Sequence, residues 1–295
     1  MLFYMKRGNK MGQGAIFLCA LLWSTSGLFI KLVDWHPLVI AGSRSFLAAL
    51  VLLGVRMFRT SRTAGPAFAP AFYTIMAGFA YAATMITFVV ANKHTASANA
   101  ILLQYSAPIW AALLGWVIAK EQPHWEHWGA LVCMAGGMLL FFKDGLAGGG
   151  FFGDSLAIFS GICFGANSVF MRMIKDGDPA DGMLLSHIFT ALFSIPFFFI
   201  YPPALSADPV LAIVFMGIIQ IGVASLLFAY GIKRVTAIQA MLTATIEPVM
   251  NPVWVLLVTA ERPSFSALVG GGIIIAAVAA SSLIGRRRAA GFSVP

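Results

Sequence analysis

Residues 93–123 read KHTASANAILLQYSAPIWAALLGWVIAKEQP, and residues 233–263 read KRVTAIQAMLTATIEPVMNPVWVLLVTAERP. Several side chains recur between the two stretches at a constant separation of 140 positions, among them Lys93 and Lys233, Ala100 and Ala240, Pro108 and Pro248, Glu121 and Glu261, and Pro123 and Pro263. Similarity at a fixed period is the signature of a chain built from repeated units. The sequence therefore consists of two copies of one unit of about 140 residues.

The beginnings of the two copies match as well, at a separation of 141 positions. The residues that correspond are Gly12 and Gly153, Trp23 and Phe164, Phe29 and Phe170, and Lys31 and Arg172. Two apolar repeats with a substrate site between them are the usual construction of a secondary transporter.

Composition places the chain in a membrane. Hydrophobic residues make up 60% of it and charged residues 10%, and the mean hydropathy is +0.88. A soluble domain carries about 25% charged residues, so this chain needs lipid to cover its surface. Ten apolar stretches reach the roughly 20 residues that cross a hydrocarbon core: 12–33, 37–58, 69–91, 96–118, 126–142, 152–172, 180–201, 208–230, 236–258 and 264–284. The predicted fold is an all-α integral membrane protein with ten transmembrane helices.

The distribution of lysine and arginine predicts the orientation. One side of the predicted membrane collects Lys6, Arg7, Lys10, Arg56, Arg59, Arg62, Lys120, Arg172, Lys175, Lys233, Arg234, Arg286, Arg287 and Arg288, whereas the other side holds only Lys93, Lys143 and Arg262. Cytoplasmic loops carry such an excess, so both termini are expected in the cytoplasm of a bacterial-type inner membrane. The net charge of +8 is scattered over short loops, which argues against a nucleic-acid partner.

Five spans in each copy make the second copy begin on the opposite side of the membrane. The two five-helix repeats are therefore expected to be inverted relative to one another. The predicted division is a first repeat over 1–144, a glycine-rich outside linker over 145–153, and a second repeat over 154–295. The basic N-terminus precedes an apolar run too long for a cleaved signal peptide, so it is interpreted as the start of the first span.

A family resemblance becomes visible in the repeated motifs. Tyr105-Ser106-Ala107-Pro108 followed by Lys120-Glu121, and Ile246-Glu247-Pro248 followed by Glu261-Arg262-Pro263, resemble the two halves of EamA-domain proteins. The segment from Trp23-Ser24 to Lys31, with Arg44 in the second span, fits the opening of the same domain. The resemblance implies the drug/metabolite transporter superfamily with ten helices, and the chain is most similar to its YddG-type aromatic amino-acid exporters.

Polar and aromatic residues inside the spans are the candidates for substrate binding, because a polar group in a membrane is costly unless it is paired or wetted. Trp23 and Phe164 correspond between the repeats and are expected to face each other across a central cavity. A large amide cannot satisfy itself within its own helix, whereas serine and threonine usually can. The predicted substrate-binding residues are Trp23, Tyr81, Asn99, Gln104, Tyr105, Phe164 and Asn167. Core packing is the alternative role for the aromatic residues.

Two prolines and one acid have separate predicted roles. Pro108 and Pro248 each remove a helix hydrogen bond and are expected to kink the fourth and ninth spans, either for packing or as gates. Glu247 precedes Pro248 and is the acidic residue placed well inside a span. It is either a proton carrier that couples transport to a gradient or a structural acid, paired with a neighbour such as Arg44 or with backbone amides.

The predicted function is export of small amphipathic metabolites, most specifically neutral and aromatic amino acids, by alternating access. Efflux of quaternary cations or nucleosides is the alternative. Phosphorylated substrates are disfavoured, because Lys31 and Arg44 are expected toward the ends of their spans. An intramembrane enzyme would have to use scattered residues such as His187 and Glu247. The sequence His124-Trp125-Glu126-His127 could suggest a metal site, but anchoring at the membrane interface explains it better. No cofactor or metal is expected, the partners are a small-molecule substrate and the lipid bilayer, and the protein is expected to be a monomer.

Overall fold

The computed structural model describes residues 2–62, 71–95, 97–142, 150–175, 177–250, 254 and 265–291. Almost all of these residues are helical, and no strand occurs among them. The first repeat contains α1 (Leu2–Trp23), α2 (Ser26–Leu32), α3 (Pro37–Arg62), α4 (Phe72–His94), α5 (Ser97–Gln104), α6 (Ala107–Leu114), the π-helix η1 (Gly115–Ala119) and α7 (Trp125–Phe142). The second contains α8 (Phe151–Met173), α9 (Pro179–Ile200), α10 (Ala207–Phe215), the π-helix η2 (Met216–Val223), α11 (Ala224–Ile232), α12 (Ala237–Ala244) and α14 (Phe265–Gly291).

Among the described residues, six helical segments are long and apolar enough to cross a membrane: Asn9–Ile30, Pro37–Phe58, Phe72–His94, Phe151–Met173, Pro179–Ile200 and Ala207–Ile232. Their surfaces fit that environment, since Phe58, Phe151 and Phe199 are each more than three-quarters exposed. The chain is therefore an all-helical, multi-pass membrane protein. The count of ten spans stays a prediction, because 96–118 is divided into three short helices and 236–258 runs beyond the described residues.

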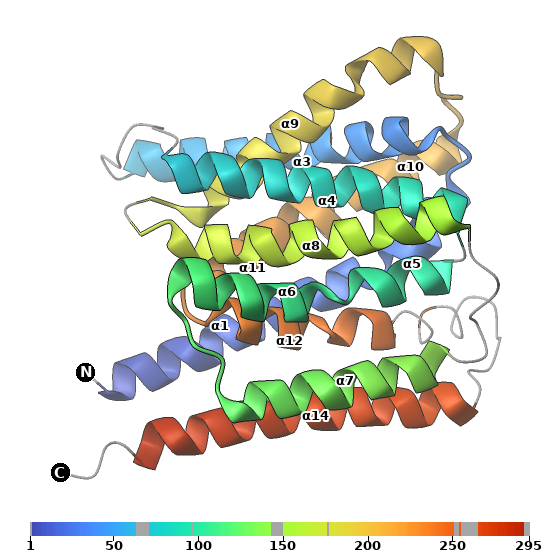
Figure 1. Cartoon of the computed structure of the whole chain (residues 1–295). Coiled ribbons are helices and arrows are strands. Elements are labelled where there is room, and N and C mark those ends of the chain that lie inside the picture. The colour runs from blue at the N-terminus through green and yellow to red at the C-terminus, as the bar shows by residue number, and fades with distance from the viewer. Residues whose placement is uncertain are drawn as a thin grey trace.

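The helices pack as a bundle in which α1 begins and α14 ends at the same end (Figure 1). We call this end the terminus side. The same pairs of corresponding helices pack together with the two repeats exchanged. Helix α4 packs on α8, and their counterparts α11 and α1 pack on each other. Helix α3 packs on η2, and their counterparts α9 and α4 pack on each other. Helices α7 and α14 pair with each other along one edge of the bundle. The repeat in the sequence is thus also a repeat in the packing.

The first helices of the two repeats run in opposite directions. A Cβ on Gly12, in the first half of α1, would lie 2.6 Å from Cβ of Arg234. Arg172, in the last turn of α8, donates from Nη1 to the carbonyl of Lys233 at 3.1 Å. The beginning of α1 and the end of α8 therefore meet the same short connection on the terminus side.

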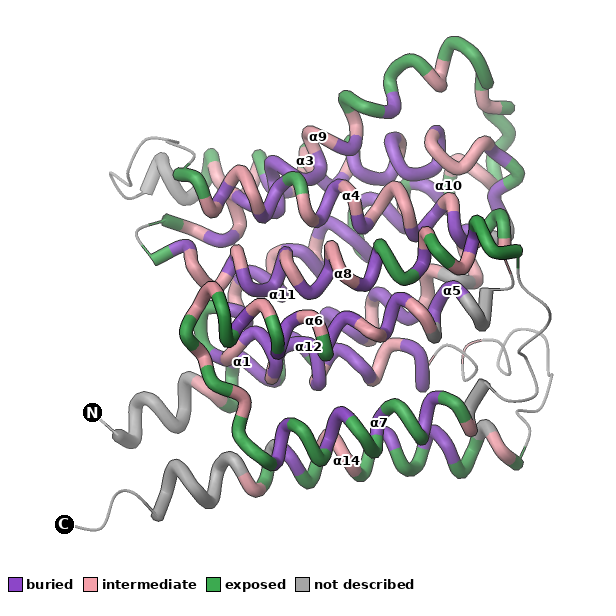
Figure 2. Tube along the Cα trace, viewed as in Figure 1, coloured by how far each residue is buried: buried purple, intermediate pink, exposed green. Residues whose placement is uncertain are grey.

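In the part of the chain that the structure describes, three helix breaks occur in the middle of predicted spans. Ser24 and Thr25 separate α1 from α2, Tyr105 and Ser106 separate α5 from α6, and Thr245 separates α12 from the helical residues 246–250. Irregular backbone at membrane depth is tolerated where it is buried in protein or lines a cavity. Burial is indeed highest on the helix faces turned toward the middle of the bundle, whereas α7, α14 and the far part of α9 carry many exposed residues (Figure 2).

Candidate central cavity

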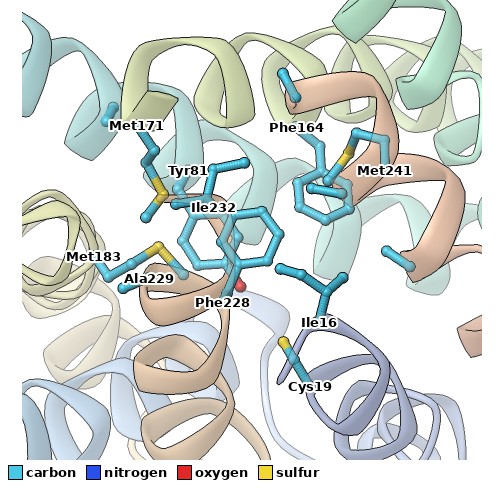
Figure 3. Packing of buried hydrophobic residues seen from close by; sticks show 14 of the residues in the cluster. Ile16, Cys19, Tyr81, Phe164, Met171, Met183, Phe228, Ala229, Ile232 and Met241 are labelled. Carbon is cyan, nitrogen blue, oxygen red and sulfur yellow. The ribbon is translucent and has the colours of Figure 1, made fainter. Parts of the chain in front are cut away.

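Four aromatic rings from four helices meet at the centre of the bundle. The ring centroid of Trp23 lies 5.5 Å from that of Phe164, 5.4 Å from that of Phe228 and 6.2 Å from that of Tyr81. These are the separations at which aromatic pairs attract through their edges and faces. Figure 3 shows Tyr81, Phe164 and Phe228 together, with Met171 and Met183 on one side and Met241 on the other.

A cavity lies beside these rings and receives residues from both repeats. Its lining has aromatic side chains (Trp23, Tyr81, Phe88, Phe164), polar ones (Ser26, Thr84, Gln104, Gln220), two charged ones (Arg44, Glu247), and Met85 and Ile221. The empty space among these atoms is about 410 Å³, but the centres of water-sized spheres can occupy only about 30 Å³ of it. The smaller volume decides what fits, because one water needs roughly 10–15 Å³ by that measure. In this conformation the cavity holds about two waters and is too narrow for a larger solute.

Side-chain hydrogen bonds fix the helix break at Tyr105 and Ser106. Gln104 donates from Nε2 to Oγ of Ser160 at 2.9 Å, and Ser160 donates to the carbonyl of Thr84 at 3.1 Å. Helix α8 approaches this break closely, because a Cβ on Gly161 would lie 2.7 Å from the carbonyl oxygen of Gln104. That carbonyl is the one that Pro108 cannot bond, since proline has no N–H. The predicted kink at Pro108 is thus a full break with the proline in the first turn of α6.

At the helix break at Thr245, Glu247 and Ala244 contact Tyr105 of the first repeat. Tyr105 lies within hydrogen-bond distance of Oε2 of Glu247 at 2.5 Å and of the carbonyl oxygen of Ala244 at 3.1 Å. The Ala244 carbonyl is the group that Pro248 leaves without its helix donor. Tyr105 therefore replaces the missing donor and at the same time contacts the acid, which ties the ninth span to the fourth.

Arg44 lies in the cavity and not toward the end of its span, which corrects the expectation from the sequence. It is only 2% exposed, its Nε has no hydrogen-bond partner, and its Nη2 faces the sulfur of Met85 at 3.8 Å. Glu247 is bonded to Tyr105 and forms no ion pair with Arg44 among the described residues, so the suggested Arg44–Glu247 pairing is wrong. Arg44 is placed by the close contact of α3 with η2, where a Cβ on Gly217 would lie 2.9 Å from the Arg44 carbonyl oxygen.

The predicted site residues divide into three groups. Trp23, Tyr81, Gln104, Phe164 and Glu247 line the cavity. Tyr105 is 3% exposed and lies outside the lining, where its hydroxyl contacts the lining residue Glu247. Asn167 is fully buried outside the lining, and neither of its amide atoms is hydrogen-bonded to a described residue. The side chain of Asn99 lies outside the described residues.

Four important residues were missed by the sequence analysis. Arg44 was misplaced, and Gln220, Phe88 and Phe228 were not considered. The repeat contained a usable signal for the two phenylalanines, because Phe88 and Phe228 stand 140 positions apart. Gln220 has no matching residue in the first repeat, but as a large amide inside the predicted span 208–230 it met the criterion applied to Gln104. It reaches the cavity from the widened π-helical turns of η2, a conformation that is frequent at functional sites. Its Nε2 donates to Thr25 at 2.9 Å, whereas its Oε1 has no partner.

An ion-pair network joins the two repeats on the terminus side. Arg172 donates from Nε to Oε1 of Glu121 at 2.8 Å, and Oε2 of Glu121 accepts from the backbone N–H of Ala237 at 3.3 Å. Lys233 lies 3.5 Å from Asp178 nearby, and Arg56 pairs with Asp181. These contacts link the ends of the second, fourth, sixth and eighth predicted spans and the starts of the seventh and ninth.

The residues considered for enzymatic or metal chemistry have other partners. His187 is buried and its Nε2 lies 2.9 Å from Oγ of Ser225, while Glu247 is bonded to Tyr105. His127 accepts from the backbone N–H of His124 at 3.2 Å, at the start of α7. Within the described part of the chain, no three His, Cys, Asp or Glu side chains are grouped so as to hold a metal ion.

Comparison with known proteins gives one family and two relatives. The EamA-like transporter family matches twice, over residues 10–143 and 151–283. Solute carrier family 35 member G1 of Mus musculus is 28% identical over 139 residues, which are 46% of this chain and 38% of the mouse protein. The Homo sapiens protein of the same name is 27% identical over 129 residues, which are 43% of this chain and 34% of the human protein. The match thus spans well under half of either relative.

A solved crystal structure shares the fold. It aligns with a TM-score of 0.80 over 95% of this chain and 99% of the other, at 18% sequence identity. At that identity the likeness concerns the arrangement of the helices and not the substrate.

Proposed function

The chain belongs to the EamA-like transporter family, and we propose that it is a secondary transporter that exports small amphipathic metabolites by alternating access around the central cavity. Neutral and aromatic amino acids, the substrates of YddG-type exporters that its motifs resemble, are the proposed cargo. The observation that carries this proposal is a cavity lined by both repeats, in which aromatic rings, amides and hydroxyls stand beside one cation and one anion. Apolar walls with a few placed polar groups are typical of small-molecule sites.

Alternating access requires the two repeats to exchange conformations around a fixed site. The cavity has room for about two waters, so we interpret the structure as a closed state that must widen to admit a solute. The contacts of Glu121 with Arg172 and Ala237 join both repeats on the terminus side. We propose that these contacts separate when the cavity opens toward that side, and that the breaks at Pro108 and Pro248 allow the half-helices to move.

The proposed orientation places both termini in the cytoplasm of a bacterial-type inner membrane, with the repeats 1–144 and 154–295 inverted and the linker 145–153 outside. A single cysteine at Gly148 should react with a membrane-impermeant thiol reagent in intact cells, whereas one at Arg287 should react only after permeabilisation. The background is a chain whose Cys19, Cys133 and Cys163 are replaced. Labelling in the reverse order would refute this topology.

Glu247 is the proposed coupling residue. Tyr105 has one proton to donate and two acceptors within reach, Glu247 and the Ala244 carbonyl. If Glu247 is protonated, it can donate to the Tyr105 hydroxyl, and Tyr105 can then donate to the Ala244 carbonyl. Protonation of Glu247 would therefore change the hydrogen bonding at the helix break. Glu247→Gln at saturating substrate should keep exchange of substrate across vesicle membranes and lose acceleration by a pH gradient. A surviving pH response would make Glu247 a structural acid.

The alternative cargo is a quaternary cation or a nucleoside, for which aromatic rings and one acid are also suitable. A competition experiment separates these substrate classes. The uptake of labelled phenylalanine by vesicles is measured in the presence of unlabelled amino acids, nucleosides or quaternary ammonium drugs. Neutral and aromatic amino acids should compete most strongly. Competition by the cations alone would replace amino-acid export with drug efflux.

A further inference from the structure

We infer that Arg44 binds the carboxylate of the substrate and that Glu247, from the other repeat, receives its ammonium group, so that the cavity selects zwitterions. This inference rests on the proposed transport function and narrows its substrate class. It depends on three features of the cavity: a buried cation without an acidic partner, an acid without a cationic partner, and several polar atoms without hydrogen bonds.

Arg44 is a buried charge that lacks a counter-ion among the residues that the structure describes. It is 2% exposed, its Nε has no partner, and no ion pair involves it among the described residues. Within the described part of the chain, its side chain makes one contact of hydrogen-bonding type, from Nη2 to the weak acceptor sulfur of Met85 at 3.8 Å. Guanidinium stays protonated in proteins, and a charge in the membrane interior is costly unless it is paired or wetted. An oxyanion from the substrate would supply the pairing, and a carboxylate matches the planar fork of arginine donors.

Glu247 gives the same cavity an opposite pole. One carboxylate oxygen contacts Tyr105 at 2.5 Å, and no lysine or arginine pairs with it in the described part of the chain. Arg44 and Glu247 both line the cavity but are not paired with each other. A zwitterion placed between them would pair with both side chains. A substrate with only a positive charge would leave Arg44 without a counter-ion, and a substrate with only a negative charge would leave Glu247 without one.

Three further lining residues carry a buried polar atom without a partner: Nε1 of Trp23, the hydroxyl of Tyr81 and Oε1 of Gln220. Buried polar groups without hydrogen bonds are rare in folded proteins and ask for an explanation. Together they offer donors for a carboxylate and an acceptor for an ammonium group. The rings of Trp23 and Phe164 then remain to contact an apolar side chain.

The test uses three compounds that share one side chain and differ in charge: L-phenylalanine, L-phenylalaninamide and 3-phenylpropionate. Dissociation constants are measured by calorimetry on the purified full chain, and uptake of labelled phenylalanine is measured in vesicles. Arg44→Gln should weaken binding of phenylalanine and phenylpropionate about 10- to 100-fold, the worth of a charged hydrogen bond, and leave the amide unchanged. Glu247→Gln should weaken phenylalanine and the amide and leave phenylpropionate unchanged.

Arg44→Lys keeps the positive charge but not the planar guanidinium, so it should lose less affinity for phenylalanine and phenylpropionate than Arg44→Gln. This variant keeps the test valid if Arg44→Gln fails to fold. Arg234→Gln is the matched control, because Arg234 is exposed and contacts Tyr230 away from the cavity, and its three constants should equal those of the unchanged protein. Equal weakening of all three compounds by the Arg44 variants, or no weakening, overturns the inference while phenylalanine transport still stands. Wild-type binding of the amide as tight as that of phenylalanine also overturns it. If none of the three compounds binds and none is transported, the amino-acid function is wrong and the inference falls with it.

Discussion

The two repeats contribute similar rings to the cavity and different charges. Trp23 in the first repeat corresponds to Phe164 in the second, and these rings pack at 5.5 Å. Arg44 corresponds, 141 positions on, to Leu185, and Glu247 corresponds, 140 positions back, to Ala107. A symmetric apolar lining suits a cavity that opens to both sides in turn. The asymmetric charges give the cavity a polarity, so a substrate with two charged ends would bind in one orientation.

Copying the acid into the other repeat should have the largest effect. Ala107 is 1% exposed, and its carbonyl oxygen would lie 2.8 Å from a Cβ on Gly165 of α8. Ala107→Glu places a charge there without room or a cationic partner, at a cost of at least about 2.5–3.5 kcal/mol. We expect little folded protein on size-exclusion chromatography. Ala107→Ser is the control and should fold, and a stable Ala107→Glu protein would show that the asymmetry of charge is not enforced by packing.

The close contact at Gly161 is a second difference between the repeats, since its counterpart in α1 is Ala20. A Cβ on Gly161 would lie 2.6 Å from Oγ of Ser106 and 2.7 Å from the Gln104 carbonyl oxygen. Gly161→Ala should therefore destabilise the protein by about 1–3 kcal/mol, measured as a lower thermal transition. Gly136→Ala is the matched control, because nothing lies within 4 Å of its Cβ position, and it should be neutral or slightly stabilising. Equal transitions for the two variants would contradict the close packing of α8 on the break.

These contacts also show what sequence reasoning could reach. The repeat, the helical membrane class and the family were readable because hydrophobic runs and recurring motifs are local properties. Arg44 was misplaced because its depth depends on how α3 packs against η2, which no local pattern records. The sequence predicts Tyr105 in the cavity, but its hydroxyl is hydrogen-bonded to the Ala244 carbonyl in the second repeat, the group that Pro248 leaves without a helix donor. Pairings between distant helices therefore had to come from the structure.

Removing either of the two corresponding rings, Trp23 or Phe164, should reduce phenylalanine transport by about the same factor. Trp23→Leu and Phe164→Leu each remove one member of an aromatic pair worth roughly 0.5–1.5 kcal/mol beyond its buried area. Each variant should raise the apparent KM for phenylalanine uptake several-fold to about tenfold, with unchanged protein level in the membrane. A tenfold effect of one variant with none from the other would mean that the repeats do not contribute equivalent walls.

The smallest effect is expected at the terminus side. Glu121→Gln weakens a partly exposed ion pair with Arg172, and such pairs contribute little. Binding of phenylalanine should not change, but a cysteine at Ser26 in the cavity should react with an impermeant thiol reagent up to about fivefold faster from the terminus side. Glu121→Asp should behave more like the unchanged protein. Slower labelling from that side would contradict the proposed closure.

The most direct test of the central claim is counterflow in reconstituted vesicles. Vesicles loaded with unlabelled phenylalanine are diluted into a trace of labelled phenylalanine, and the internal label is followed over time. A carrier that exposes one cavity alternately to the two sides predicts a transient accumulation of label above the equilibrium level, reduced by Trp23→Leu. Simple equilibration without an overshoot, or no entry of label for any amino acid tested, would contradict alternating-access transport of amino acids by this chain.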